Sequence, residues 1–224
     1  MTAQILSTKK LSSAQKQPIL DANMEFLEYD AISIKLISFK SPKFIQNAIF
    51  SSQNAIKSMK KYQKDLLFGN IENCFCVGEK TTSILKENGQ NVIKTALNAS
   101  ELANFIQKTY ENEDFYFFCG SHRRDELPEI VRMSKNRLFE IKTYRIESKS
   151  VSFKQKASKI LFFSPSGVQS FIAENNIKNA LAVCIGETTA SEARKHTSNM
   201  VISNETTVES VIEKAIESTS IANI

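Results

Sequence analysis

Ile49-Phe50-Ser51-Ser52-Gln53-Asn54-Ala55 and Phe162-Phe163-Ser164-Pro165-Ser166-Gly167-Val168 are two versions of one pattern in this chain. Each is followed by a second apolar run that ends in glycine, at Cys76-Val77-Gly78-Glu79-Lys80-Thr81 and at Cys184-Ile185-Gly186-Glu187-Thr188-Thr189. In both copies, a short apolar run ends in a small-residue turn and enters a helical pattern, and the second run does the same. A repeat of strand–helix units predicts two similar α/β halves with a cleft between them.

The same alternation of strand and helix patterns continues through most of the chain, which is typical of parallel sheets flanked by helices. In the central block we expect strands near residues 45–50, 73–77, 91–94 and 114–118, and helices near 53–64, 79–88, 100–111 and 125–135. In the last block we expect strands near 159–163, 182–185 and 199–202, and helices near 166–175, 187–196 and 207–219. Thr206 and Glu209 form a capping-box pattern at the start of the last helix.

The distribution of strands indicates how the two halves share the chain. The last block has too few strands for an independent sheet, and the N-terminal segment has no domain of its own. We therefore predict one discontinuous lobe of residues 1–36 and 147–224, with a second lobe of residues 41–139 inserted into it. The stretches that join them, about 32–40 and 138–147, have extended character and could pair as a two-stranded linker.

Composition and charge argue against several classes of function. The chain has 224 residues, 42% of them hydrophobic, with a net charge of +5 and a pI of about 8.9. This small positive excess suits an anionic small ligand, whereas nucleic-acid binding would show a clustered basic stripe with interleaved aromatic residues. No apolar stretch has the length of a membrane span. Because no long apolar stripe is left once the helices are assigned to cores, we expect a monomer.

Cysteine and histidine usage gives no metal signal and favours a reducing compartment. The four cysteines, Cys74, Cys76, Cys119 and Cys184, lie within or at the ends of apolar runs and form no CxxC pair. With only two histidines in the chain, a zinc site is not indicated. Buried free thiols are typical of proteins of the cytoplasm, where we expect this one.

Small residues follow the predicted strands at the points where helices begin. Gly78, Gly120, Gly167 and Gly186 all lie at or just after the carboxyl ends of such strands. Ordinary turn chemistry favours glycine and serine at these places. The alternative is that the free backbone N–H groups of these turns bind carboxylates or phosphates, as in other open α/β sheets. No turn matches a P-loop or a GxGxxG motif, so nucleotide binding is not indicated.

Hydroxyl side chains are more numerous in these turns than helix capping requires. Ser164 with Pro165 is a good helix start, and Ser51 and Ser52 serve the same purpose in the first copy. Capping uses one hydroxyl in each turn and leaves several others in the first helical turns, namely Thr81, Thr82, Ser166, Thr188 and Thr189. Such hydroxyls can donate hydrogen bonds to an anionic ligand beside the backbone N–H groups.

Two further features have both a structural and a functional interpretation. The turn Gly120-Ser121-His122-Arg123-Arg124 carries two arginines, which could bind ligand carboxylates or pair with Asp125 and Glu126. Tyr144 lies in the second linker stretch, where it could simply pack or could point its phenol toward a ligand. A phenol with an ordinary pKa of about 10 stays protonated at neutral pH and can donate a proton to a leaving hydroxyl.

Taken in order, these motifs resemble the uroporphyrinogen-III synthase family, which makes the tetrapyrrole ring in haem biosynthesis. The resemblance spans nearly the whole chain and rests on Phe50 to Ala55, Val77 to Thr81, Gly120 to Leu127, Thr143-Tyr144, Phe163 to Val168 and Ile185 to Ala190. It implies two α/β lobes joined by a two-stranded linker, with one lobe discontinuous. It implies a substrate, hydroxymethylbilane, which is a linear tetrapyrrole whose side chains are all carboxylates.

The resemblance also implies a reaction that needs no metal or organic cofactor. The terminal hydroxyl leaves as water to give an azafulvene, and the substituted end of the last ring attacks it. The spiro intermediate then fragments and recloses with the last ring inverted. By this resemblance, the protein is expected to be a lyase that holds the linear tetrapyrrole so that this closure is faster than simple head-to-tail closure.

The family's functional residues carry over to particular positions of this sequence. Tyr144 matches the linker tyrosine thought to assist departure of the hydroxyl. The positions that match the substrate-binding turns, or lie within them, are Ser51, Ser52, Gln53, Gly78, Thr81, Gly120, Ser121, Arg123, Ser164, Pro165, Ser166, Gly167, Gly186, Thr188 and Thr189. The family's opening strand often ends in Thr-Arg-Pro, where this chain has Thr8-Lys9-Lys10; Lys9 supplies charge there without the bidentate fork of arginine. Gln53 stands where the family commonly has proline.

Two other functions share this predicted fold. One is a two-lobed binding or regulatory module that holds a carboxylate-rich metabolite and releases it unchanged. The other is a member of the family that has lost its activity, since several motifs are imperfect.

Overall fold

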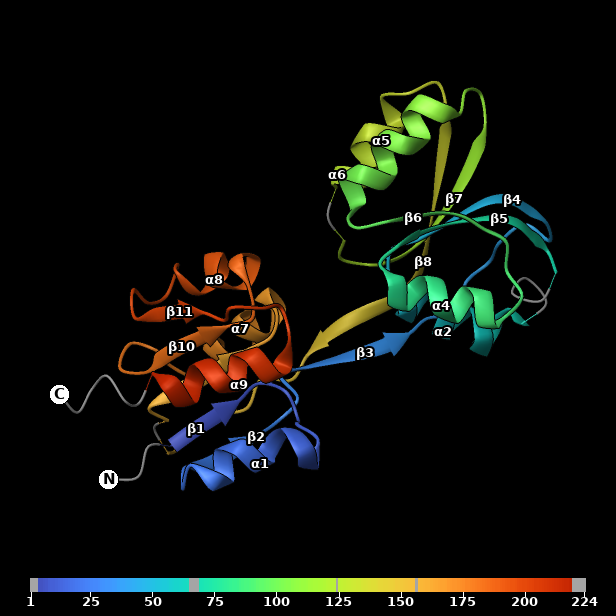
Figure 1. Cartoon of the computed structure of the whole chain (residues 1–224). Coiled ribbons are helices and arrows are strands. Elements are labelled where there is room, and N and C mark those ends of the chain that lie inside the picture. Colours follow the sequence, from blue (N-terminus) through green and yellow to red (C-terminus); the bar gives the residue numbers. More distant parts are fainter. Residues whose placement is uncertain (1–3, 65–68, 124, 156, 219–224) are drawn as a thin grey trace. The chain divides into compact units, whose positions relative to one another are not determined.

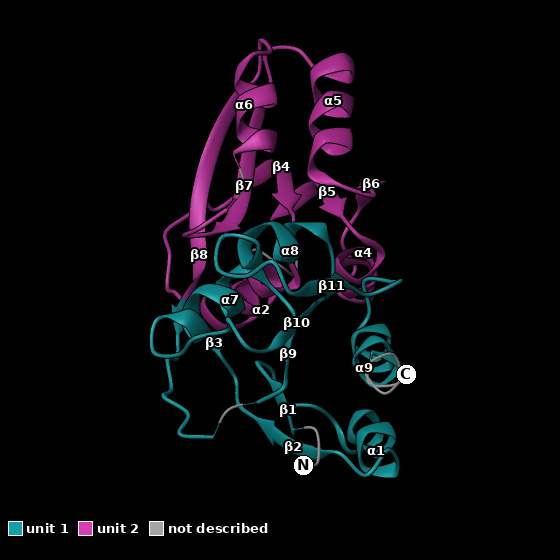
Figure 2. Cartoon of the chain, turned by 90° about the vertical axis from the view of Figure 1, so that its left-hand side faces the viewer, with its two compact units in different colours: residues 1–33, 147–224 teal, residues 34–146 magenta. Residues whose placement is uncertain are grey.

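The computed structural model describes residues 4–64, 69–123, 125–155 and 157–218. The chain divides into two compact units (Figure 2): unit 1 comprises residues 1–33 and 147–224, and unit 2 comprises residues 34–146. Each unit is an α/β structure with its own sheet (Figure 1), and each has its own hydrophobic core. Within the described part of the chain, no helix is both long enough and apolar enough to cross a membrane.

Unit 1 contains a five-stranded parallel sheet in the order β11-β10-β9-β1-β2. The strands are β1 (Gln4–Ser7), β2 (Glu25–Glu28), β9 (Lys159–Phe162), β10 (Leu181–Cys184) and β11 (Met200–Ile202). The helices are α1 (Ser13–Asp21), α7 (Pro165–Ile172), α8 (Glu187–Ala193) and α9 (Val208–Glu217).

Helices cover both faces of this sheet because successive strand residues point to opposite sides. Ile5 and Leu161 pack with residues of α1 and α9. Their neighbours Leu6 and Ile160 pack instead with residues of α7 and α8. The two faces therefore hold separate parts of the core, as in a doubly wound α/β domain.

Unit 2 contains a six-stranded sheet in the order β3-β8-β7-β4-β5-β6. The strands are β3 (Ile32–Leu36), β4 (Ile45–Phe50), β5 (Ile71–Val77), β6 (Val92–Ala96), β7 (Asp114–Gly120) and β8 (Arg137–Ser148). The helices are α2 (Gln53–Tyr62), α4 (Glu79–Glu87), α5 (Ala99–Thr109) and α6 (Glu126–Arg132). α2 and α4 cover one core and α5 and α6 cover the other.

The structure confirms the α/β fold class and the repeat of strand–helix units. The first copy forms β4-α2-β5-α4 and the second forms β9-α7-β10-α8, and in each copy the two strands are neighbours in their sheet. The strands of unit 2 from β4 to β8 are parallel as expected, and the sheet as a whole is mixed. There, β3 is an edge strand that runs opposite to β8 (Figure 1), so the two extended stretches are strands of the second sheet.

Helix caps explain where several helices begin. Ser52 accepts a hydrogen bond from the backbone N of Asn54 at the start of α2. Helix α9 starts one residue later than its sequence pattern predicts, because Thr207 and not Thr206 accepts the hydrogen bond from Ser210 N. The cap is a threonine in either case, so the start of the helix moves without changing its buried face.

Candidate functional site

In unit 1 the predicted binding residues gather at one edge of the sheet. Because its strands run parallel, their carboxyl ends meet at the same edge, which is where open α/β sheets bind ligands. Lys9 follows the end of β1, Ser164 follows β9 and Gly186 follows β10. The fold thus brings together turns that are far apart in the sequence.

A cavity of about 260 Å³ lies at this edge of unit 1. Its lining residues are Thr8, Lys9, Asp30, Ile32, Phe163 and Ser164. The Lys9 ammonium lies 6.0 Å from the centroid of the Phe163 ring and has no ion-pair partner among the described residues. One carboxylate oxygen of Asp30 accepts a 3.0 Å hydrogen bond from Lys10 N. The cavity therefore offers an uncompensated cation, a carboxylate and an aromatic ring to a ligand.

The start of α7 is held tightly against the turn after β1. Ser164 Oγ accepts a 3.0 Å hydrogen bond from Gly167 N, and Pro165 occupies the first turn of the helix. A side chain at Gly167 would place its Cβ 3.3 Å from Ser164 Oγ and 3.5 Å from Thr8 Oγ1. A side chain at Gly167 would thus fit tightly against the Ser164 hydroxyl, and the Gly167 N–H is already used by the cap. Ser166 is half-buried in the same turn.

The two predicted threonines that follow β10 differ in their exposure to solvent. Thr188 is exposed at the start of α8, whereas Thr189 is only 3% exposed. Glu187 forms an ion pair with Arg194 within the same helical segment. Gly186 caps the helix without a side-chain hydrogen bond, and a Cβ there would meet the Thr206 methyl group at 3.3 Å. Thr188 is thus the more accessible of the two hydroxyls.

In unit 2, the turns after β4 and β5 repeat this arrangement at the carboxyl ends of neighbouring parallel strands. Ser51, Ser52 and Gln53 are half-buried, and Ser52 is the helix cap. Gly78 has φ of +83°, a conformation that favours glycine, and its turn leads into α4 without a side-chain cap. Thr81 is 4% exposed, and its hydroxyl has no hydrogen-bond partner in the described part of the chain.

Tyr144 lies beside the carboxyl end of β7. Its carbonyl accepts hydrogen bonds from Ser121 N at 2.8 Å and from Ser121 Oγ at 3.3 Å. Its ring lies directly on Gly120, where an added Cβ would be 2.7 Å from Tyr144 Cε2 and 2.8 Å from Cζ. The phenol is half-buried and has no hydrogen-bond partner among the described residues. Gly120 is thus the surface on which the ring rests, and the hydroxyl is available to a ligand.

Arg123 is held by carboxylates of unit 2. Its guanidinium binds Glu140 through two hydrogen bonds of 2.7 and 2.5 Å and also pairs with Asp125. Lys142 and Arg132 bind the same glutamate. The hydrogen bonds from Arg123 lower the pKa of Glu140 from 4.5 to about 2, against the effect of burial. Arg124, the second arginine of this turn, lies outside the described residues.

The cysteines are poorly suited to nucleophilic chemistry. All four are buried free thiols. Burial raises the pKa of Cys76 and of Cys184 to about 12, so both are protonated at neutral pH. Among the described residues, no group of three or more His, Cys, Asp or Glu side chains comes together to hold a metal ion.

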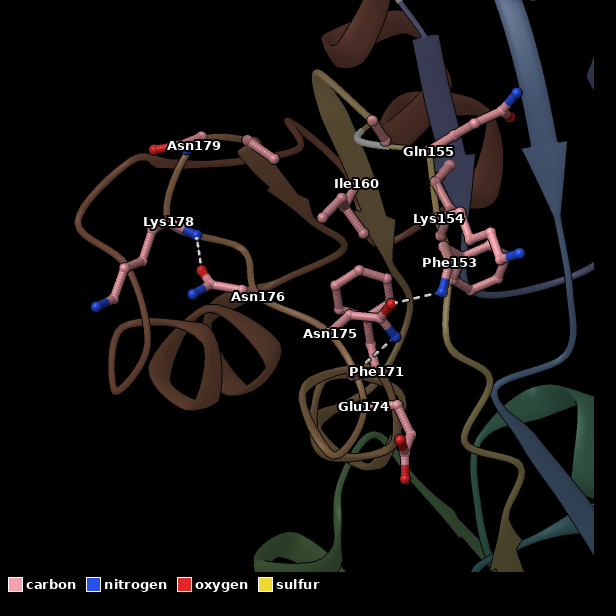
Figure 3. A pocket seen from close by; sticks show the side chains of 13 residues that line it. Phe153, Lys154, Gln155, Ile160, Phe171, Glu174, Asn175, Asn176, Lys178 and Asn179 are labelled. Atoms are coloured by element: carbon pink, nitrogen blue, oxygen red, sulfur yellow. Dashed lines mark hydrogen bonds between the residues drawn. The ribbon is translucent and has the colours of Figure 1, made fainter.

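A larger cavity of about 360 Å³ in unit 1 contains none of the predicted residues. It lies near the start of β9 and the end of α7, and Figure 3 shows its Phe153, Ile160 and Phe171 side chains. Asn175 accepts a 2.9 Å hydrogen bond from Phe153 N and donates one of 3.0 Å to Phe171 O. These hydrogen bonds give the Asn175 side chain a structural role in the loop after α7.

Sequence reasoning missed Asp30, Phe163 and Glu140. Asp30 could have been found because it follows β2 just as Lys9 follows β1, at the carboxyl edge of the sheet. Phe163 lies between the end of β9 and the cap of α7. From the sequence it reads as the last residue of a buried strand, and nothing there indicates that it lines a cavity. Glu140 on β8 contacts Arg123 in the turn after β7, and no local pattern indicates such a pair.

The family model for uroporphyrinogen-III synthase HemD matches residues 20–213. The porphyrin biosynthesis protein HemD of Ruminiclostridium josui is 27% identical over 155 residues, which cover 63% of this chain and 31% of that protein. The chain thus spans only about a third of that relative's length.

Two solved structures have a similar fold. The uroporphyrinogen-III synthetase of Helicobacter pylori has a TM-score of 0.70 at 17% identity, covering 97% of this chain and 99% of that one. A mutant uroporphyrinogen-III synthase of Thermus thermophilus has a TM-score of 0.69 at 11% identity, covering 98% of this chain and 100% of that one. Because the family model matches most of the residues of both units, the chain belongs to the uroporphyrinogen-III synthase HemD family.

Proposed function

We propose that this protein is a uroporphyrinogen-III synthase, which cyclises hydroxymethylbilane to uroporphyrinogen III with inversion of the last pyrrole ring and loss of water. The observation that carries the proposal is the family match over residues 20–213, which includes strands and helices of both units. The turns at the carboxyl edges of the two sheets support it, because their N–H groups and hydroxyls suit a substrate rich in carboxylates.

In unit 1 we assign substrate carboxylates to Lys9 and to the start of α7. The Lys9 ammonium has no anionic partner among the described residues, and its cavity also includes Ser164. The N-terminus of a helix adds a partial positive charge and free N–H groups, which favour a carboxylate there. The remaining turn residues assigned to substrate binding are Ser51, Ser52, Gln53, Gly78, Thr81, Gly120, Ser121, Arg123, Pro165, Ser166, Gly167, Gly186, Thr188 and Thr189.

We assign the departure of the terminal hydroxyl to Tyr144. Its phenol donates its proton to that hydroxyl as the C–O bond breaks with its electron pair on oxygen, so that water leaves and Tyr144 is left as its phenolate. The proton that completes the water is balanced by the one lost from the free end of the last ring when the macrocycle closes. That proton returns to Tyr144, so the phenol is restored within each turnover.

The remaining contribution of the protein is positioning. Without the enzyme, the linear tetrapyrrole can close head to tail, so the protein must hold the last ring with its substituted carbon against the azafulvene. Fixed contacts to several substrate carboxylates restrict the conformations of the linear tetrapyrrole. They favour closure through the substituted carbon of its last ring over head-to-tail closure.

A binding or regulatory module for a carboxylate-rich metabolite is the second candidate. It would use the same turns, but it would have no need for a phenol without a protein partner. The hydroxyl of Tyr144, which has no partner among the described residues, therefore favours the enzyme.

We further propose that the protein acts in the cytoplasm, as a monomer and without a cofactor. We also propose that its lobes have the limits expected from the sequence.

Product analysis tests the proposal. Purified protein is incubated with a large molar excess of freshly prepared hydroxymethylbilane, the products are oxidised, and the uroporphyrin isomers are separated by chromatography. We expect many equivalents of isomer III for each protein molecule. Isomer I alone, formed at the rate of a protein-free control, would reject the enzyme, and a binding titration with the same substrate would then test the binding module.

A further inference from the structure

One irregularity in the pairing of β7 with β8 determines the direction in which Tyr144 points. Along these parallel strands, Phe118 pairs with Ile141 and Cys119 with Lys142, but Gly120 pairs with Tyr144. Thr143 is thus an extra residue without a partner on β7, which is the pattern of a β-bulge.

The bulge changes the face of the sheet on which Tyr144 lies. Successive strand residues alternate between faces. Ile141 packs against the core cluster that contains Phe118, whereas the Lys142 ammonium lies 3.5 Å from Cys119 Sγ, which belongs to the core on the other face. With regular alternation, Tyr144 would lie on the Lys142 face. It packs instead against the same cluster as Ile141, which puts its ring on Gly120.

Thr143 is held in this irregular position by its own polar groups. It is fully buried, with 0% of its surface exposed. Its hydroxyl donates a 3.2 Å hydrogen bond to Cys119 O, and its carbonyl accepts one of 2.8 Å from Ile37 N. On the other side of the turn, Ser121 N donates a 2.8 Å hydrogen bond to Tyr144 O. The Thr143 hydroxyl therefore connects the bulge residue to β7 by a side-chain hydrogen bond.

We infer that Thr143 is a positioning residue: its buried hydroxyl keeps the bulge that turns the Tyr144 phenol onto Gly120. This inference rests on the proposed function, because only a reaction that uses the phenol gives its direction a consequence for turnover. Because Thr143 is fully buried, it acts through Tyr144 and not on the substrate itself.

Substitution of Thr143 separates positioning from folding. Thr143→Val keeps the shape and removes the hydrogen bond to Cys119 O, whereas Thr143→Ser keeps the hydroxyl. Loss of one hydrogen bond should lower kcat for isomer III about five-fold in Thr143→Val, with KM unchanged. Thr143→Ser should stay near the wild-type rate. Ser134→Ala is the control, because its hydroxyl donates to Val131 O and accepts hydrogen bonds from Asn136 N and Nδ2 near the start of β8, so that its removal disturbs the same unit without touching the bulge.

The same substitution in the Tyr144→Phe variant shows whether Thr143 acts through the phenol. In Tyr144→Phe there is no hydroxyl to aim, so adding Thr143→Val should cause no further loss of kcat. A purely structural role would cause the same fold-loss in both backgrounds. Equal losses, or a Thr143→Val variant with the wild-type kcat, would overturn the inference.

Amide hydrogen exchange tests the bulge without any activity. The N–H groups of Ser121 and Ile37 should exchange faster in Thr143→Val than in the wild type, and should be unchanged in Thr143→Ser. If the wild type forms no isomer III, the proposed function fails, while faster exchange at these two amides would still support the bulge contact. Unchanged exchange in Thr143→Val would reject the contact even in an active enzyme.

Discussion

Gly120→Ala tests the contact between Gly120 and Tyr144. The new Cβ would lie 2.7 Å from Tyr144 Cε2, whereas ordinary contacts begin at 3.4 Å, so the ring must shift by about 0.7 Å. Displacing a reacting group by about 1 Å can lower a rate by about 100-fold, so we expect kcat to fall roughly 10- to 100-fold. Overpacking should also lower the free energy of unfolding by about 1–3 kcal/mol.

The assay is the initial rate of isomer III formation at saturating hydroxymethylbilane, with thermal unfolding measured on the same samples. Gly89→Ala is the control, because Gly89 has φ of +72° in the same unit but nothing within 4 Å of its added Cβ. It should lose stability through backbone strain and keep its kcat. In a Tyr144→Ala background the Gly120→Ala change should cost nothing further, because the ring that it displaces is gone.

Two results would refute this reasoning. A Gly120→Ala enzyme with the wild-type kcat would mean that the position of the ring does not matter for turnover. An equal additional loss in the Tyr144→Ala background would mean that the methyl group acts on the substrate or on the backbone, and not on the tyrosine.

Three further predictions concern single residues. The Glu140 pKa of about 2 is below its unfolded value, so its ionised form stabilises the protein above about pH 4.5, and this contribution disappears as the pH falls toward 2. The free energy of urea unfolding should therefore fall by about 3 kcal/mol less between pH 5 and pH 2 in Glu140→Gln than in the wild type. The same fall in both proteins would contradict this prediction. Lys9→Ala should raise KM several-fold and leave Tm unchanged, because the side chain is exposed, whereas Lys10→Ala, which lies outside the cavity lining, should not change KM. Gly78→Ala, at φ of +83°, should lose about 1–2 kcal/mol in urea unfolding through strain, since its Cβ meets nothing within 4 Å; a neutral substitution would count against the turn geometry.

The fold was predictable because its signals are local and repeated. Ser52 and Ser164 each follow an apolar run and start a helix, and this pairing of strand end with cap defines the strand–helix units. The ribbon of β3 and β8 followed from the distribution of strands, but its membership in the second sheet did not. Edge pairing depends on contacts between residues such as Ile37 and Thr143, which lie far apart in the sequence.

The candidate site was predictable only in part. Glycines and hydroxyls mark the turns, so residues such as Ser164 and Gly186 could be placed at the sheet edge from the sequence. This β-bulge has no glycine on its own strand to mark it, so the role of Thr143 and the direction of Tyr144 could not be predicted from the sequence. The partner of Arg123 was expected among its neighbours Asp125 and Glu126; Asp125 does bind it, but the bidentate partner is Glu140 on β8. That choice depends on the register between β7 and β8, which is a property of the folded sheet.

The most direct test of the proposed mechanism compares wild type with Tyr144→Phe for isomer III produced per protein molecule from the same preparation of hydroxymethylbilane. We predict many turnovers to isomer III by the wild type. For Tyr144→Phe we predict that kcat falls by about 100-fold or more, because general acid catalysis contributes about 100- to 10,000-fold. The phenol has no protein partner among the described residues, so Tm should be unchanged. Equal turnover by the two proteins would contradict the role of Tyr144, and isomer I alone from both would contradict the proposed function.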